Sequence, residues 1–254
     1  RLVGSEMCIR DRIHTYFRNT DTINFYVNTI EENDIPEIDD GQKDPPESLI
    51  ESLNYFIISC AIARKRGLKA PFTFLCHPDS STKEHKRYRK WIDDYFDKLI
   101  EMLDEEYGDS KVLQEVNFNN LINEISQNLG FPDLSDWSQI QVEVIRIIEK
   151  VPRISIINKD NKIEDLKAFW EQSRIHIIIG AMSIERGFTV EGLMVTYLSR
   201  NPGTNADNIQ QRARFCGYKS EDHLNLSRLW LDNGNLNFYK ACLLYTSPSP
   251  RDGL

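Results

Sequence analysis

The 254-residue sequence lacks several features that would assign its class at once. No apolar run approaches the roughly 18 residues needed to cross a bilayer, so no membrane span is expected. No Cys-x-x-Cys pair is present, which argues against structural zinc and indicates a reducing compartment, so we expect a cytoplasmic protein. The phosphate-binding pattern Gly-x-x-x-x-Gly-Lys-Ser/Thr does not begin at any glycine of the sequence. The chain therefore lacks the usual loop for a nucleoside triphosphate.

The charge balance leans to the acidic side. The chain has 31 lysines and arginines against 39 aspartates and glutamates, a net charge of −8, with 40% hydrophobic residues. This composition is ordinary for a globular protein, and the length fits one large domain or one domain with an insertion. A net negative charge argues against a protein that coats nucleic acid over its whole surface, but it leaves room for a local basic groove.

The two ends of the chain are related to each other. One DNA segment, read on opposite strands, encodes both residues 1–12 and residues 242–254. This segment resembles a transposase-type sequencing adapter, so we predict that both ends are translated assembly artefacts and exclude them from the fold. The natural part is then expected at residues 13–241, from a gene truncated on both sides.

The first half of this natural part is predicted to be mostly helical. Residues 13–44 are polar and are expected to form an irregular connector. A helix should follow Pro46 and end near Gly67, and a short strand should follow at residues 72–76. Ser81 and Glu84 have capping-box spacing and predict the start of another helix, whose aromatic stripe is more typical of core than of a base-stacking surface. With further helices at residues 118–129 and 140–148, a helical insertion is expected at about residues 82–150.

The second half alternates between strands and helices. Short apolar runs at residues 154–157, 175–179 and 193–198 predict parallel strands that are covered on both faces. A helix is expected at residues 163–170, and after the last of these strands another helix can begin at residues 208–215. The alternation indicates a three-layer α/β domain over residues 45–241.

One candidate site lies in the loop that follows the strand at residues 175–179. Open α/β sheets bind ligands at the carboxyl ends of their strands, and this loop begins at such an end. Gly180 and Gly187 would let the backbone approach a phosphate, and Thr189 is a suitable donor. Arg186 could pair with a phosphate or with an internal carboxylate, so the loop taken alone could be structural or functional.

A second candidate site lies between residues 207 and 219. Gln211, Arg214 and Lys219 are expected on one helix and its exit. They could form a solvated face, but guanidinium groups also suit bidentate phosphate binding. A cation delivered to a γ-phosphate from a neighbouring domain stabilises the charge that develops in phosphoryl transfer.

The order and spacing of these two segments resemble motifs V and VI of superfamily-two helicases. They resemble more closely the Z-one (Z1) domain, which occurs in proteins proposed to be endonucleases and is associated with superfamily-two helicase modules. The matching residues of the first motif are Gly180, Arg186, Gly187, Thr189, Glu191, Gly192 and Leu193. Those of the second are Gln211, Arg214, Gly217, Tyr218 and Lys219. The sequence departs from the pattern at Glu185, where serine is usual, at Cys216, where an aromatic residue is common, and at Lys219, a point charge in place of an arginine fork.

The resemblance implies a fold and a division of labour. The fold would be a RecA-like helicase C-terminal domain, the second half of an ATP-dependent DNA helicase or translocase in a restriction or defence system. Arg214 and Lys219 would be the catalytic residues, Gln211 and Gly187 would contact the nucleotide, and Arg186 and Thr189 would face the nucleic acid. ATP and Mg²⁺ would be bound mainly by a missing N-terminal RecA-like domain, to which residues 13–44 would be the linker.

The partners implied are DNA, that N-terminal ATPase domain, and nuclease or defence-system subunits. The fragment alone is then expected not to hydrolyse ATP.

Two other functions stay open on the sequence. A metal-dependent DNA endonuclease needs clustered carboxylates, commonly an Asp followed later by Glu-x-Lys. Asp133 is the nearest start, but no Glu-x-Lys follows it at strand spacing, and Asp93, Asp94 and the run at residues 104–106 are expected on solvated helix surfaces. His77 could be a ligand or a base, but a structural or nucleic-acid-contact role is expected for it. A non-catalytic nucleic-acid-binding module is the other alternative.

Overall fold

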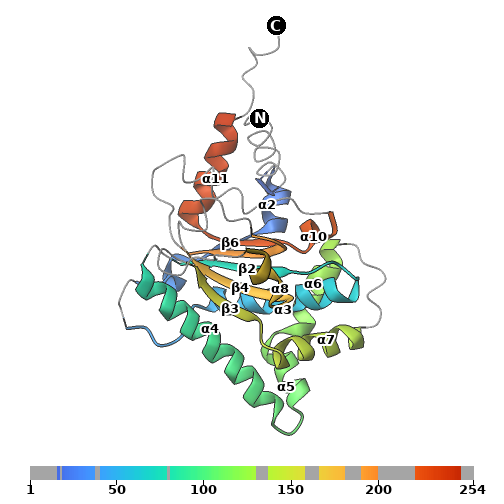
Figure 1. Cartoon of the computed structure of the whole chain (residues 1–254). Helices are drawn as coiled ribbons and strands as arrows, with labels where there is room; N and C mark the ends of the chain where they lie inside the picture. The colour runs from blue at the N-terminus through green and yellow to red at the C-terminus, as the bar shows by residue number, and fades with distance from the viewer. Residues whose placement is uncertain are drawn as a thin grey trace.

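The computed structural model describes residues 16–17, 19–37, 41–78, 81–129, 137–157, 166–180, 190–199 and 221–246. In these residues six strands form one sheet of order β1-β6-β5-β2-β4-β3. All five strand pairs are parallel. The strands are β1 (Val27–Ile30), β2 (Phe72–His77), β3 (Arg153–Ile157), β4 (Ile175–Gly180), β5 (Leu193–Leu198) and β6 (Arg228–Asp232). Figure 1 shows helices on both faces of this sheet, as expected for an α/β domain of three layers.

The four strands predicted from apolar runs are confirmed as β2, β3, β4 and β5. Every residue of β2, β4 and β5 is buried. These three strands are adjacent, with Leu75 paired to Ile178 on one side and to Thr196 on the other. Central parallel strands are covered on both faces, which is why their sequences are almost continuously apolar.

Five helices form the layer on one face of the sheet. They are α3 (Glu47–Lys65), α4 (Thr82–Leu103), α5 (Gly108–Glu115), α6 (Phe118–Leu129) and α7 (Trp137–Glu149). Together with β2, β4 and β5 they enclose the largest apolar cluster. Of the helices in the 82–150 region, predicted as an insertion, α4 contacts the sheet directly, whereas α5, α6 and α7 pack chiefly against α3, α4 and one another (Figure 1). All four contribute residues to the main core. The short helix α5 was not predicted.

The aromatic stripe of α4 is core, as predicted. Its buried members recur at three- and four-residue steps, which place them on one side of the helix. They are Tyr88, Trp91, Ile92, Tyr95, Phe96 and Leu99. The predicted capping box is only half formed, because Ser81 Oγ accepts from the Lys83 amide at 3.2 Å while the Glu84 carboxylate pairs with Arg87.

The opposite face is covered by shorter segments. Helix α8 (Leu166–Glu171) contributes Phe169 and Trp170, which pack against residues of β2, β3 and β4. Helix α11 (Asn233–Thr246) and the segment around α2 (Thr20–Tyr26) pack against β1, β5 and β6. A further helix, α10 (Glu221–Asn225), precedes β6.

The expectation of an irregular connector at residues 13–44 is wrong for the described part of this region. It contains α2, the edge strand β1 and a 3-10 turn, Glu32–Asp34. Strand β1 buries only its two end residues, Val27 and Ile30, and exposes the two between them. An edge strand with so little buried surface has no apolar run, so its sequence resembles a polar loop. Strand β6 was also not predicted.

Gly192 has a backbone position that only glycine accommodates. Its φ is +59°, and a Cβ there would overlap the carbonyl oxygen of Pro71. The close approach of Gly192 to Pro71 allows two hydrogen bonds from Thr73. Its amide donates to the Gly192 carbonyl at 2.8 Å, and its hydroxyl donates to the Glu191 carbonyl at 2.6 Å. The glycine in the Glu191-Gly192-Leu193 pattern thus has a structural role, the docking of β5 against the start of β2.

We predict that Gly192→Ala destabilises the chain much more than Gly67→Ala. Gly67 also has a positive φ, +71°, but no atom lies within 4 Å of the added Cβ. Its alanine variant should lose about 1 kcal/mol from the left-handed backbone alone. Gly192→Ala adds a backbone overlap and should lose more than about 3 kcal/mol. Urea unfolding of both variants checks this, and equal losses would contradict it.

His176 is a core residue of β4, the strand next to the edge strand β3. It is fully buried in β4, its ring centroid is 5.0 Å from those of Phe169 and Trp170, and its Nε2 lies 2.9 Å from the Ser173 carbonyl oxygen. Burial lowers the pKa of His176, in spite of backbone hydrogen bonds that favour the charged ring.

We therefore predict that the protein loses stability as the pH falls below the ordinary histidine pKa. The unfolded chain takes up a proton near its usual pKa of about 6.5, whereas folded His176 resists it, so protonation favours unfolding. The free energy of unfolding, measured from about pH 7.5 to about pH 5.5, should fall more steeply for the native chain than for His176→Gln. Parallel profiles would show that His176 contributes nothing to the pH dependence.

Candidate functional site

The strand order defines one place where the chain leaves the sheet in opposite directions. Strand β2 leads on to β3, at one edge of the sheet, whereas its neighbour β5 leads on to β6, on the other side. Open α/β sheets bind ligands outside the carboxyl ends of their strands where the exits diverge in this way. We call this place, where His77 of β2 pairs with Leu198 of β5, the switch point.

Both predicted motif segments leave the sheet beside the switch point. Strand β4 ends at Gly180 and β5 ends at Leu198, and these two strands flank β2. The segment with Arg186, Gly187 and Thr189 follows β4. The segment with Gln211, Arg214 and Lys219 follows β5, and these six residues lie outside the described residues.

Two pairs of buried hydroxyl groups hold the end of β5. The Tyr88 hydroxyl on α4 lies 3.3 Å from the hydroxyl of Ser199, the residue that directly follows β5. The neighbouring Tyr197 shares a hydrogen bond of 3.0 Å with Ser48, in the first turn of α3. Each of these four residues is buried, so the folded state would lose free energy of stabilisation if any of the hydroxyl groups had no hydrogen-bond partner. The two pairs fix the end of β5 to two helices, α3 and α4.

Tyr197 is held in its neutral form. Burial raises the pKa of Tyr197 well above its ordinary value, and the nearby Tyr88 adds to the increase. The hydrogen bond with Ser48 acts in the opposite direction but does not offset the burial. A neutral buried phenol is suited to orient neighbours by hydrogen bonding, not to act as a base near neutral pH.

Helix amides at the carboxyl edge are already occupied by the protein's own side chains. The Asp34 carboxylate accepts from the amides of Glu47 and Ser48 at 2.8 Å each, at the start of α3. Ser81 accepts from the Lys83 amide at the start of α4. The start of a helix is a common phosphate-binding position, but at α3 it is filled by a carboxylate.

The residues before α3 are fastened to the side of α4. Arg87 donates from Nη1 to the Glu37 carbonyl at 3.1 Å, and its guanidinium lies 4.6 Å from the centre of the Trp91 ring. Trp91 donates from its indole nitrogen to the Lys43 carbonyl at 2.7 Å. These contacts position the connection from β1 to α3 beside the switch point.

Of the carboxylates considered for metal binding, Asp93 and Asp94 lie on the surface of α4 as predicted, whereas residues 104–106 lie in the turn between α4 and α5 and not on a helix. Asp93 pairs with Arg89 at 3.1 Å and Glu105 pairs with Lys111 at 2.6 Å, while Asp94, Asp104 and Glu106 are exposed. Among the described residues, no group of three or more His, Cys, Asp and Glu side chains could hold a metal ion. Asp133 lies outside these residues.

The thiols give no further site among the described residues. Cys60 and Cys76 are buried and free, and burial raises the pKa of each thiol well above its usual value. Such thiols are unreactive core groups.

The fold and the switch point define an α/β domain with an all-parallel sheet whose candidate site lies at the carboxyl edge. In a comparison with protein families, residues 48–247 match the family described as the Z1 domain. The chain therefore belongs to the Z1 domain family. No curated protein and no solved structure was found to match it. Within the described residues, no helix is long and apolar enough to cross a membrane.

We predict that Ser48 and Tyr197 are energetically coupled. Ser48→Ala and Tyr197→Phe each leave the other hydroxyl buried without this hydrogen bond, whereas the double variant removes both groups. The double variant should be more stable than the sum of the single losses predicts, by about 1 kcal/mol. Urea unfolding of the four proteins in this cycle tests the coupling. Strict additivity would mean that the hydroxyl pair does not hold β5 to α3.

Proposed function

We propose that this Z1 domain is the second, RecA-like half of an ATP-dependent DNA helicase or translocase in a restriction or defence system. In this proposal the domain moves relative to an ATPase half encoded upstream, and each cycle of ATP binding and hydrolysis advances the pair along DNA. The half described above supplies cations and nucleic-acid contacts at the carboxyl edge of its sheet.

The position of the two motif segments carries the proposal. By the family resemblance the two segments have different roles, one in nucleic-acid binding and the other in nucleotide binding. The strands that precede them, β4 and β5, nevertheless flank the same central strand, β2. The switch point between β2 and β5 is where an open parallel sheet binds its ligand. A sheet with the two segments at opposite edges would not have supported a shared site.

The described residues fit a domain that completes a nucleotide site without forming the whole of it. The start of α3 is closed to a phosphate by Asp34, and the sequence has no Gly-x-x-x-x-Gly-Lys-Ser/Thr loop. ATP and Mg²⁺ would therefore be held mainly by the upstream half, where the bound metal neutralises the charge of the phosphates. What this chain would add is a cation at the γ-phosphate, from Arg214 with Lys219 beside it.

The remaining roles follow the family resemblance. Gln211 and Gly187 would contact the nucleotide, and Arg186 and Thr189 would contact the nucleic-acid backbone. The two buried hydroxyl pairs, Ser48 with Tyr197 and Tyr88 with Ser199, would act on the second segment indirectly, since they fix the end of β5, which precedes that segment.

We predict that Arg214→Ala abolishes DNA-stimulated ATP hydrolysis by the full-length protein, with its upstream domain restored from the genome. An arginine that reaches the γ-phosphate contributes about 10³-fold or more to kcat, so a loss of that order is expected. Lys98→Ala is the matched control, because it removes one positive charge from an exposed position on α4 that pairs with Glu115. Steady-state phosphate release with and without DNA gives the comparison.

The same assay separates the alternatives. Unchanged turnover in Arg214→Ala, together with DNA binding, would favour a non-catalytic binding module. Mg²⁺-dependent cleavage of DNA by residues 13–241 alone would favour an endonuclease and would move the chemistry into this domain.

A further inference from the structure

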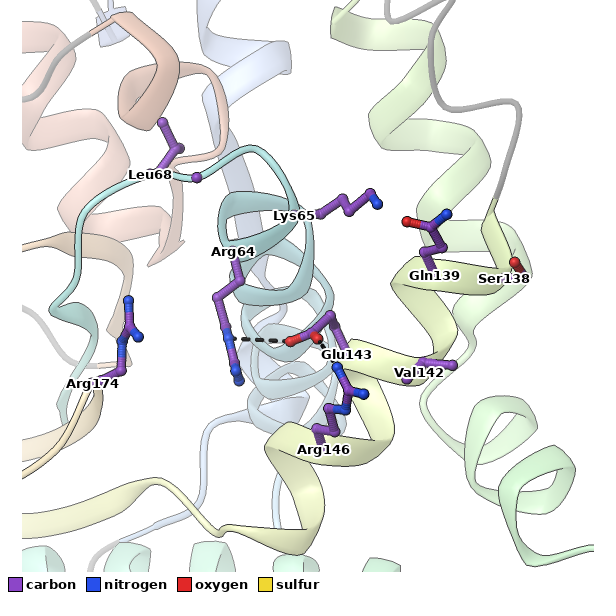
Figure 2. Close-up of a pocket in the computed structure, with 10 residues that line it drawn as sticks. Arg64, Lys65, Leu68, Ser138, Gln139, Val142, Glu143, Arg146 and Arg174 are labelled. Atoms are coloured by element: carbon purple, nitrogen blue, oxygen red, sulfur yellow. Dashed lines mark hydrogen bonds and ion pairs between the residues drawn. The ribbon is translucent and has the colours of Figure 1, made fainter.

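A groove of about 620 Å³ lies at the amino edge of the sheet, opposite the switch point. Its walls come from three segments that are distant in the sequence: the end of α3, the first turns of α7, and Arg174, which directly precedes β4 (Figure 2). The six-residue strand β2 separates this edge from the switch point by about 17 Å at 3.3 Å per residue. We call it the amino-edge groove.

Positive charge is in excess in the amino-edge groove. The described residues of its lining include four cations, Arg64, Lys65, Arg146 and Arg174, and one carboxylate, Glu143, an excess of three positive charges among these residues. Lys65 and Arg174 form no ion pair with a described residue. The excess stands out because the chain as a whole has a net charge of −8.

Two of the guanidinium groups are held in place by a single shared carboxylate. Arg64 Nε lies 3.2 Å from Glu143 Oε2, and Arg146 Nη1 lies 2.6 Å from Glu143 Oε1. Figure 2 shows the two arginines converging on Glu143 from different helices. One negative charge cannot neutralise both, and the side chain of Glu143 is only 16% exposed, whereas that of Arg146 is 56% exposed. Glu143 thus orients the two guanidinium groups and leaves them with positive charge that can bind an anion.

Helix stability explains only part of this cluster. Arg64 and Lys65 lie in the last turn of α3, where cations interact favourably with the helix dipole. Arg146 lies in the last turn of α7 and interacts in the same way with the dipole of that helix, whereas Arg174 belongs to no helix. Helix dipoles do not explain why cations from three separate segments line one groove, and an anionic ligand would.

We infer that the amino-edge groove binds the sugar-phosphate backbone of a nucleic-acid strand. Planar guanidinium groups suit phosphate oxygens, and Ser138 and Gln139 supply neutral donors of the kind that contact nucleic-acid backbones. None of the described residues that line the groove is aromatic, so none of them offers a ring to stack a base. The groove would therefore read charge and backbone shape, not sequence.

This inference goes beyond the proposed motor, because the groove lies on the other edge of the sheet and needs no ATP. It would give the domain a second contact with a DNA strand that enters or leaves the motor.

The test is the salt dependence of binding of a fluorescein-labelled oligonucleotide to the whole 254-residue chain, measured by anisotropy. Each phosphate contact on duplex DNA contributes about 0.9 to the slope of log Kd against log salt concentration. Lys65→Gln/Arg174→Gln should therefore weaken binding and reduce this slope by about 2. The charge-preserving variant Lys65→Arg/Arg174→Lys should keep the native slope.

A matched charge control is Lys98→Gln/Lys111→Gln, which removes two positive charges from exposed positions on α4 and α5. It should leave the slope unchanged. The inference is overturned if the groove variant binds like the native chain, or if the control loses as much of the slope as the groove variant. Displacement of the oligonucleotide by adenosine monophosphate at an equal phosphate concentration would also overturn it, since the groove would then take a free nucleotide.

These outcomes are distinguishable from failure of the proposed function. The binding assay contains no ATP and no upstream domain, so it can succeed or fail whatever the effect of Arg214→Ala on turnover.

Discussion

The burial of β2 on both faces is the constraint on which the rest of the structure depends. A strand whose six residues are all buried needs a strand on each side and a helical layer above and below. Strands β4 and β5 provide the sides, and the layer of α3 to α7 covers one face. This arrangement places the carboxyl ends of β4 and β5 next to that of β2, so the two motif segments start beside the same point. The close docking of Gly192 on Pro71 secures the other end of two of these strands, β5 and β2.

The two edges of the sheet differ in how their charged groups are satisfied. At the carboxyl edge, Asp34 is used internally by the amides of α3, and the buried hydroxyls bond to one another. At the amino edge, Glu143 serves two arginines, and Lys65 and Arg174 have no ion-pair partner among the described residues. In the described part of the chain, the carboxyl edge is therefore a rigid support for the segments that leave it, while the amino edge offers charge directly to a ligand.

The central part of the fold could be predicted from the sequence because burial on two faces leaves a strong pattern. The apolar runs of β2, β4 and β5 and the stripe of α4 each match the structure closely. Strand β1 could not be predicted, because only Val27 and Ile30 are buried in it. The amino-edge groove was also missed. Arg64 and Lys65 look like ordinary helix-end charges in the sequence, and their proximity to Arg146 and Arg174 is a property of the fold.

The candidate site residues could be proposed from the sequence only through their motif order, and they lie outside the described residues. Hydrogen exchange of the full-length protein, with and without DNA and a non-hydrolysable ATP analogue, tests most directly whether function is centred on the switch point. Our account predicts that the largest increase in protection falls on the amides of residues 181–189 and 200–219. Unchanged exchange in both segments, with protection gained elsewhere in this domain, would contradict it.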